Sequence, residues 1–152
     1  MSAILAIDTS TSRTSVGLMV NSELMWAAHE DGATAHAEAV PRLVQKALAI
    51  NNDISQVIVG MGPGPYTGLR AGISFAQAFA WARNIEVAGV CSLDAIACTA
   101  TEYIAATDAR RKEIYWAKYM DGKRVDGPHV TVPAEVSGEV FVGEGAHKYG
   151  LC

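Results

Sequence analysis

The sequence predicts an α/β protein with a mixed sheet flanked by helices. Three observations predict this class. Short apolar and β-branched runs of strand length alternate with longer segments of helical periodicity over the first hundred residues. Clusters of Gly, Pro, Asn and Ser separate these runs, as expected for turns. The chain has 152 residues, of which 50% are hydrophobic, and this suits one domain or two small lobes that share a core. We therefore expect a β-β-β-α-β-α-β-α lobe over residues 1–100 and a smaller second lobe over residues 101–152.

Three strands are expected to open the chain. Residues 3–7 are an apolar run, and residues 14–20 place Val16, Leu18 and Val20 on one face. Residues 23–29 follow a two-residue turn at Asn21-Ser22. These short connections predict an antiparallel meander.

The turn after the first strand is rich in acidic and hydroxyl side chains, in the order Asp8, Thr9, Ser10, Thr11 and Ser12. Such side chains form turns by bonding to the nearby backbone. A carboxylate at the end of a first strand is also where some nucleotide-binding folds hold metal and phosphate. Asp8, Thr9 and Ser10 are therefore a weak candidate cofactor site, and an ordinary turn is the alternative.

A helix is expected over residues 34–50, with Thr34 as its N-cap and Glu38 near its start. Pro41 either kinks this helix or marks where its regular part begins. Its apolar residues recur at helical spacing, at Val40, Leu43, Val44, Ala47 and Leu48.

The most distinctive stretch is residues 57–72, which reads as a buried strand, a glycine-rich loop and a helix start. A phosphate-binding P-loop needs Lys and Ser or Thr after its last glycine, but Leu69 and Arg70 follow Gly68. A dinucleotide fingerprint needs G-x-G-x-x-G, but Gly62, Gly64 and Gly68 are spaced one residue wider. The remaining interpretation is a tight turn that lets a helix approach the sheet closely.

The helix that follows, through residue 82, is apolar almost all round. Its only polar strip is Arg70, Ser74 and Gln77, and Trp81 ends this strip. A helix of this kind must be covered on more than one side. We expect its own sheet on one side and a partner, or further core, on another. Small residues recur at every fourth position of this helix, at Gly68, Gly72, Ala76 and Ala80. On a helical wheel, one apolar stripe comprises Leu69, Ile73, Ala76 and Ala80.

The remainder of the chain shows weaker sequence patterns for secondary structure. A strand at residues 86–90 is followed by Ser92, a candidate N-cap. Further strands are expected at residues 103–107, 113–120, 130–132 and 140–142. The basic run Arg110-Arg111-Lys112 is interpreted as a hairpin turn with solvated charge, with RNA contact as the alternative.

Composition narrows the class of function. A net charge of -4 and a pI near 5.5 argue against a free-standing nucleic-acid binder. Three cysteines without C-x-x-C predict neither a disulfide framework nor a zinc site, and four scattered histidines predict no metal site. The apolar run at residues 3–7 is too short for a signal peptide or a membrane span. We expect a soluble, cytoplasmic protein with no membrane contact.

The motifs resemble a known family in chain order. The expected lobe resembles the half-unit of the actin, Hsp70 and sugar kinase superfamily, a ribonuclease H-like fold. More specifically, four segments are similar to signatures of the bacterial TsaB family, also called YeaZ. They are Ile7-Asp8-Thr9-Ser10, Gly62-Pro63-Gly64-Pro65-Tyr66-Thr67-Gly68-Leu69-Arg70-Ala71-Gly72, Asp108-Ala109-Arg110-Arg111-Lys112-Glu113-Ile114-Tyr115 and Gly143-Glu144-Gly145-Ala146.

The resemblance implies a non-catalytic subunit of the complex that makes N6-threonylcarbamoyladenosine in tRNA. It implies a TsaD-like catalytic partner, a TsaE-like ATPase partner, and contact with tRNA only through the complex. The interface would be built from the first two helices, at Val40, Leu43, Ala47, Gly68, Leu69, Gly72, Ile73, Ala76 and Ala80, and the signature loop comprises Gly62, Pro63, Gly64, Tyr66, Thr67 and Arg70.

The chain itself would require no cofactor, although ATP or ADP could sit at the shared interface, and a homodimer could form without the partner. Family members continue past the position of Cys152, so the second lobe is expected to be incomplete.

Two other classes of function stay open. A small phosphotransferase or ATPase would use Asp8 for magnesium and Thr9 and Ser10 for phosphate, but the chain shows no convincing second phosphate loop. A peptidase would need a nucleophile with a base or a metal, and the sequence assembles neither.

Overall fold

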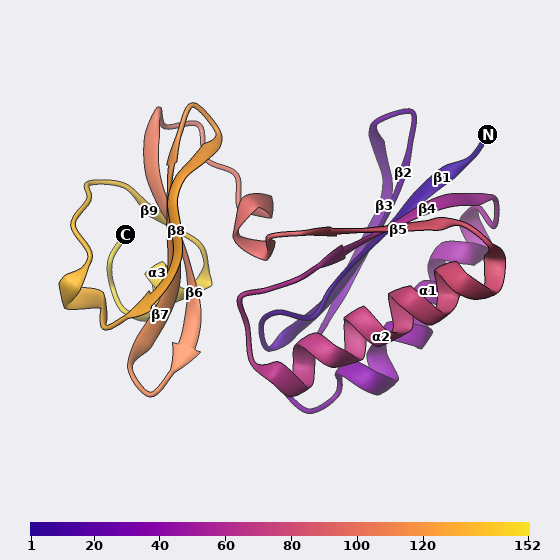
Figure 1. Cartoon of the computed structure of the whole chain (residues 1–152), viewed down its shortest axis with the longest axis horizontal. Coiled ribbons are helices and arrows are strands. Elements are labelled where there is room, and N and C mark those ends of the chain that lie inside the picture. Colours follow the sequence, from indigo (N-terminus) through magenta and orange to yellow (C-terminus); the bar gives the residue numbers. More distant parts are fainter. The chain divides into compact units, whose positions relative to one another are not determined.

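The computed structural model describes every residue from Met1 to Cys152. The chain divides into two compact units, Met1–Val90 and Cys91–Cys152 (Figure 1). Each unit has its own sheet and its own buried core. The division was expected after residue 100, so residues 91–100, which were assigned to the first lobe, belong to the second unit. No helix is long and apolar enough to cross a membrane.

The first unit is built on a five-stranded mixed sheet. Its strands are β1 (Ala3–Asp8), β2 (Arg13–Val20), β3 (Glu23–Asp31), β4 (Ile54–Gly60) and β5 (Glu86–Val90). The order across the sheet is β3-β2-β1-β4-β5, with β1, β2 and β3 antiparallel and with β4 parallel to both β1 and β5. The predicted meander, the mixed sheet and the order of elements as far as β5 are confirmed. The last helix expected in this lobe is only a short 3-10 helix at residues 92–95, and it belongs to the second unit.

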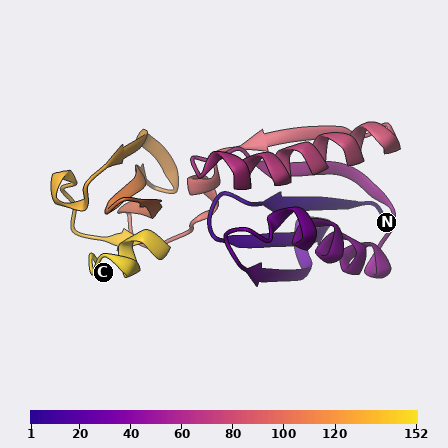
Figure 2. The same cartoon turned by 90° about the horizontal axis from the view of Figure 1, so that it is seen from below.

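Two helices cover one face of this sheet. They are α1 (His36–Ile50) and α2 (Tyr66–Arg83), which lie side by side below the strands (Figures 1 and 2). The alternating positions of β1 and β2 explain the packing, because Leu5, Ile7, Val16 and Leu18 all point to this face and are almost fully buried.

Three predicted boundaries need correction. Helix α1 begins at His36, and its N-cap Ala35 provides no side-chain bond, so Thr34 does not cap it. Pro41 lies exposed within the continuous helix. Strand β4 begins at Ile54, because parallel pairing with β1 extends it to a polar segment that lacks a strand-like pattern. Ser92 is the first residue of a short 3-10 helix, η1 (Ser92–Ala95), and Cys91 is its N-cap.

The second unit is a four-stranded sheet with little helix. Strands β6 (Glu102–Arg110), β7 (Glu113–Met120) and β8 (Lys123–Thr131) form an antiparallel meander. The short strand β9 (Phe141–Val142) pairs parallel with β6, and α3 (Glu144–Lys148) packs against β6. A 3-10 turn, η2 (Pro133–Glu135), links β8 to β9.

Two elements of this unit differ from the predictions. Strand β8 was expected only at residues 130–132, so the prediction missed its first seven residues, which include Pro128. It is an edge strand, where proline is tolerated since one row of backbone groups faces solvent. The signature segment that starts at Gly143 begins the short helix α3, which the sequence did not predict, with Gly143 as N-cap at φ 101°.

Candidate functional site

The turn between β1 and β2 is held closed by its own side chains. The Asp8 carboxylate accepts hydrogen bonds from the Ser10 backbone N–H at 2.8 Å and from the Ser10 hydroxyl at 2.6 Å. The Thr9 hydroxyl donates to the Gly68 carbonyl at 2.5 Å and accepts from the Gly72 N–H at 3.2 Å. Thr9 and Ser10 are both buried. The turn is thereby bonded to the first turns of α2.

The glycines of the signature loop allow this close approach. A Cβ on Gly72 would lie 2.5 Å from the Thr9 hydroxyl oxygen, and one on Gly64 would overlap the Ser10 carbonyl. A Cβ on Gly68 would lie 3.0 Å from the His36 ring and 3.1 Å from the Thr9 carbonyl oxygen. The spacing of these three glycines therefore follows from the packing of α2 on the β1–β2 turn. This agrees with the interpretation that the glycines permit close packing.

The same geometry tests the turn as a phosphate site. Both hydroxyls that would approach a phosphate, those of Thr9 and Ser10, are buried and donate hydrogen bonds inside the unit. Gly64 lies directly against the Ser10 backbone. These residues do not fit a nucleotide phosphate, because binding would require the turn to open. No group of three or more His, Cys, Asp or Glu side chains is placed to hold a metal ion.

His36 is buried beneath the same corner. Its Nδ1 lies 2.7 Å from the Thr14 hydroxyl, and its ring lies under Gly68. Burial lowers the pKa of His36, and this outweighs the opposing effects of the Thr11 backbone and the Asp8 carboxylate. The neutral imidazole is therefore the form that the fold accommodates, as a core residue between α1 and α2.

Most of the predicted interface residues are interior, and this is a correction at the level of residues. They form the packing of α1 and α2 on each other and on the sheet, and of the nine only Val40 also lines a groove at the surface. Seven are buried and two are partly buried: Val40, Leu43, Ala47, Gly68, Gly72, Ala76 and Ala80, then Leu69 and Ile73. Gly68 and Gly72 lie on the inner face of α2 because the helix closely approaches Thr9 in the β1–β2 turn.

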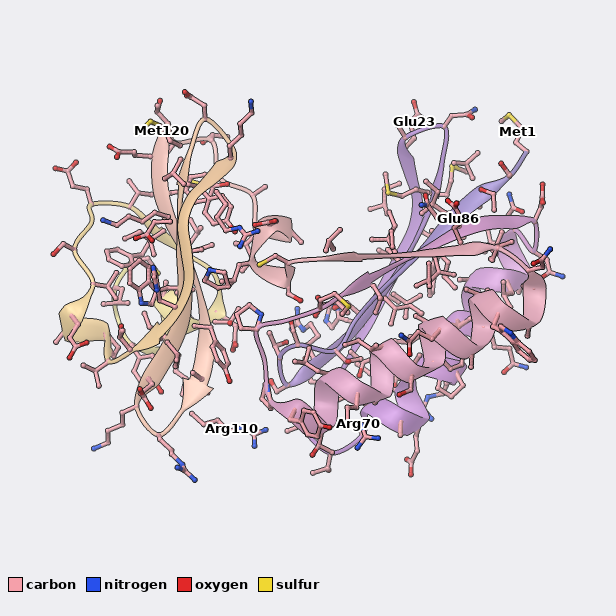
Figure 3. The ribbon with its side chains drawn as sticks, in the orientation of Figure 1. Met1, Glu23, Arg70, Glu86, Arg110 and Met120 are labelled. Carbon is pink, nitrogen blue, oxygen red and sulfur yellow. The ribbon has the colours of Figure 1, made fainter.

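The outward face of α2 carries a different set of side chains, which we call the outer stripe. Tyr66 and Trp81 are 73% and 86% exposed, among the most exposed large apolar side chains of the chain. Their spacing, with three exposed polar residues between them, places all five on one helical face. Arg70 projects outward from α2 (Figure 3), with its guanidinium carbon 5.4 Å from the centre of the Tyr66 ring. The outer stripe comprises Tyr66, Arg70, Ser74, Gln77 and Trp81.

A groove of about 420 Å³ runs beside the outer stripe, between the two helices. Its walls mix apolar and polar side chains, and a partner's side chain could be inserted there. The groove is lined by Ala37, Val40, Tyr66, Thr67, Arg70, Ala71, Ser74 and Phe75. Of the predicted signature residues, Tyr66, Thr67 and Arg70 therefore lie on the surface of α2, whereas Gly62, Pro63 and Gly64 form the loop before it. Sequence reasoning named Trp81 only as the end of a polar strip. Its signal was a large aromatic residue on the polar side of a helix.

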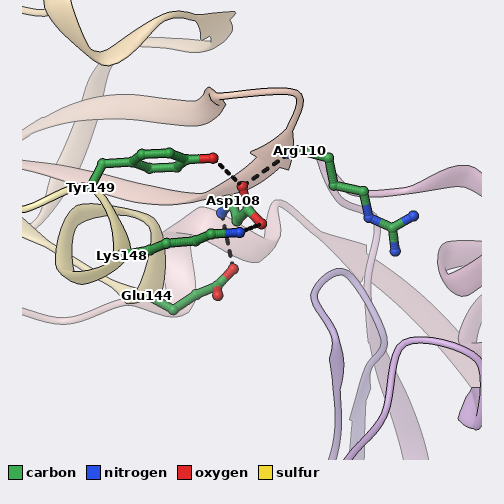
Figure 4. Close-up of polar contacts among 5 residues, drawn as sticks. All are labelled: Asp108, Arg110, Glu144, Lys148 and Tyr149. Atoms are coloured by element: carbon green, nitrogen blue, oxygen red, sulfur yellow. Dashed lines mark hydrogen bonds and ion pairs between the residues drawn. The ribbon is translucent and has the colours of Figure 1, made fainter.

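In the second unit, two signature segments meet in one polar cluster (Figure 4). The Asp108 carboxylate accepts hydrogen bonds from Lys148 Nζ at 2.6 Å, the Tyr149 hydroxyl at 2.9 Å and the Arg110 N–H at 3.0 Å. The Glu144 carboxylate accepts from the Asp108 N–H at 2.9 Å. Burial alone would raise the pKa of Asp108, but these hydrogen bonds hold it below its ordinary value. The cluster fixes α3 to the end of β6.

Comparisons with known proteins agree with the fold and with these motifs. A sequence model of the family described as TsaD, tRNA N6-adenosine threonylcarbamoyltransferase, matches residues 29–143. An uncharacterized protein of Mycobacterium tuberculosis is 45% identical over 143 residues, which cover 90% of this chain and 68% of that protein. The tRNA threonylcarbamoyladenosine biosynthesis protein TsaB of Escherichia coli is 37% identical over 127 residues, which cover 77% of this chain and 54% of that protein.

A solved structure also matches this chain. The structure of YeaZ from Pseudomonas aeruginosa matches with a TM-score of 0.77 and 30% identity, covering 91% of this chain and 70% of that chain. The chain spans about half the length of the TsaB relatives that it matches. By the matched family model, these relatives and this structure, the chain belongs to the TsaD family and is a TsaB/YeaZ-type member of it.

Proposed function

We propose that this chain is a non-catalytic subunit of a complex that makes N6-threonylcarbamoyladenosine in tRNA, where it supports a TsaD-like catalytic subunit. The names of its relatives support the pathway. The observation that carries the subunit role is the outer stripe of α2. Two aromatic side chains and an arginine lie exposed on one face of this helix, and two of the three, Tyr66 and Arg70, also line the groove. Trp, Tyr and Arg are the residue types that dominate binding energy at protein interfaces.

The turn at Asp8 supports the non-catalytic part of the proposal. Its hydroxyls donate hydrogen bonds within the unit and tie the turn to α2. We therefore assign Asp8, Thr9 and Ser10 a structural role and propose that ATP or ADP, where the complex uses it, is held mainly by partner subunits. A TsaE-like ATPase would join the same complex, tRNA would be recognised largely through it, and a homodimer through the outer stripe would form when the partner is absent.

The experiment that tests this proposal measures assembly. Light scattering would follow the chain alone, then with a TsaD-like subunit from the same genome, with and without ATP and a TsaE-like subunit. A heterodimer is expected, and Trp81→Ala should weaken it by at least about 2 kcal/mol, or roughly 30-fold in Kd, because a hot-spot aromatic residue is lost. Leu24→Ala is the matched control, since Leu24 is 65% exposed on β3, away from the helices.

Two results would contradict the proposal. If Trp81→Ala and Leu24→Ala bind the TsaD-like subunit as tightly as the unaltered chain, the outer stripe is not the interface. If no heterodimer forms and the chain alone hydrolyses ATP with magnesium, in a manner lost in Asp8→Ala, the function belongs to nucleotide chemistry at the β1–β2 turn.

A further inference from the structure

Three hairpins in this chain turn through two residues that both have positive φ. In the first, between β2 and β3, Asn21 and Ser22 have φ values of 51° and 64°. In the β7–β8 hairpin, Asp121 and Gly122 have φ values of 51° and 75°. Turns of this kind favour Asn, Asp and Gly, because these residues tolerate left-handed backbone. These two hairpins largely follow the local rule.

The hairpin between β6 and β7 does not follow it. Its turn residues are Arg111 and Lys112, with φ values of 54° and 64°. The preceding residue, Arg110, also has a φ of 64°, next to a shift in the strand register. Residues with a Cβ, such as Arg and Lys, are unfavourable in this left-handed backbone conformation, because the Cβ lies too close to the following carbonyl oxygen. Three successive cations are thus held where the turn itself favours other residues, and such strain points to a role beyond folding.

The cations at this tip form no ion pair with the rest of the protein, although the carboxylate residue Glu113 is the cross-strand neighbour of Arg110. Arg110, Arg111 and Lys112 are all exposed, and none of them takes part in an ion pair. The nearby carboxylate of Asp108 is already bonded to Lys148 and Tyr149.

The tip is also held in place. The Asp108 carboxylate accepts the Arg110 backbone N–H, while Lys148 and Tyr149 bind the same carboxylate from the α3 side. The Arg110 guanidinium extends away from this cluster (Figure 4), at the end of the hairpin (Figure 3). The backbone that carries these cations is therefore held in one conformation, which limits the conformational entropy lost when a ligand binds.

We propose that Arg110, Arg111 and Lys112 form a contact for the phosphate backbone of the tRNA substrate, and this rests on the proposed function. Guanidinium groups match phosphate oxygens with paired hydrogen bonds, and lysine adds a point charge. A chain with a net charge of -4 can supply such a contact because the three cations are concentrated at one tip. The contact orients tRNA in the complex and carries no base specificity.

The test replaces the turn cations by the residues that this turn favours, in the double variant Arg111→Asn with Lys112→Gly. Affinity of the complex with a TsaD-like subunit for an unmodified tRNA transcript would be measured by fluorescence anisotropy from low to high salt. Each lost phosphate contact should reduce the slope of log K against log salt by about 0.7–0.9. Two contacts predict a slope shallower by about 1.4–1.8 and, at 0.1 M salt, an affinity lower by about 25- to 60-fold.

A stability measurement distinguishes the loss of an RNA contact from damage to the fold. The midpoint of chemical denaturation should stay the same or rise in the double variant, because Asn-Gly suits a turn with two positive φ values. The matched control is Lys118→Gln with Lys123→Gln, which removes two unpaired cations from β7 and β8 of the same unit and should leave the salt slope nearly unchanged.

Each further outcome decides the proposal. An unchanged tRNA affinity and slope in a complex that assembles normally would overturn the RNA contact and leave the proposed function intact. Weaker assembly with the TsaD-like subunit at unchanged tRNA affinity would also overturn it, and would assign the tip to a protein partner. If no complex assembles, the proposed function fails. The chain alone is then titrated with tRNA, and equal binding by the variant rejects the contact.

Discussion

Replacing Gly72 by Ala tests whether α2 needs a glycine where it crosses the β1–β2 turn. The new Cβ would lie 2.5 Å from the Thr9 hydroxyl oxygen and 3.1 Å from the Thr9 methyl carbon. Thr9 cannot move away freely, because it is 1% exposed and its hydroxyl bonds to both Gly68 and Gly72. Either α2 must rise from the sheet, or Thr9 must give up these bonds.

The expected loss of stability combines opposing effects. Alanine improves helix propensity by up to about 1 kcal/mol relative to glycine. Overpacking a well-packed interior costs about 1–3 kcal/mol, and the two strained hydrogen bonds contribute about 1 kcal/mol each. We therefore expect Gly72→Ala to lower the free energy of unfolding of the first unit by about 2–4 kcal/mol.

Denaturant titration followed by helical circular dichroism measures this effect, because both long helices belong to the first unit. Gly17→Ala is the matched control: the nearest atom to its new Cβ would be 3.7 Å away, so it should change stability by less than about 1 kcal/mol. Thr9→Ala should make Gly72→Ala less costly, by at least about 1 kcal/mol in a double-mutant cycle. A Gly72→Ala protein as stable as the unaltered chain would refute the close-packing argument.

Two further predictions concern protonation. Burial lowers the pKa of His36 below 6.5, so the folded state binds fewer protons than the unfolded state, and stability should fall as pH drops through about 6.5. Denaturant titrations at several pH values should show that the free energy of unfolding depends less on pH in His36→Asn than in the unaltered chain. Asparagine keeps an acceptor near the Thr14 hydroxyl. The same pH dependence in both proteins would contradict the role of the buried imidazole. The Asp108 pKa is also lowered, but for a carboxyl this adds stability above about pH 4 that is lost as pH falls through the folded value. Hydrogen exchange should therefore show faster opening of α3 in Asp108→Asn than in the unaltered chain at neutral pH. The unaltered chain should also open α3 faster in acid than at neutral pH. Equal protection of α3 in both proteins at neutral pH would show that the cluster does not hold the helix.

Much of the first unit could be predicted because its signals are local. Apolar runs of strand length define β1, β2 and β5, and the turn at Asn21-Ser22 joins two strands by residues that tolerate positive φ. The apolar character of α2 also indicates that the helix is covered on several sides. Strand β8 was predicted only in part, because an edge strand with exposed side chains need not show an alternating pattern.

The two faces of α2 illustrate what local sequence patterns cannot predict. The local pattern of residues predicts that a glycine-rich loop leads into a long helix in which small residues recur at every fourth position. It does not predict that these small residues face inward, because that depends on the contact of Gly72 with Thr9, 63 residues earlier in the chain. The aromatic and polar residues thereby became the outward face. Likewise, the sequence pattern singled out Asp108 as part of a signature segment but did not single out Lys148. Their bond spans 40 residues and forms because β9 and α3 return to β6. Periodicity specifies which residues share a face, whereas contacts distant in sequence decide which face is buried.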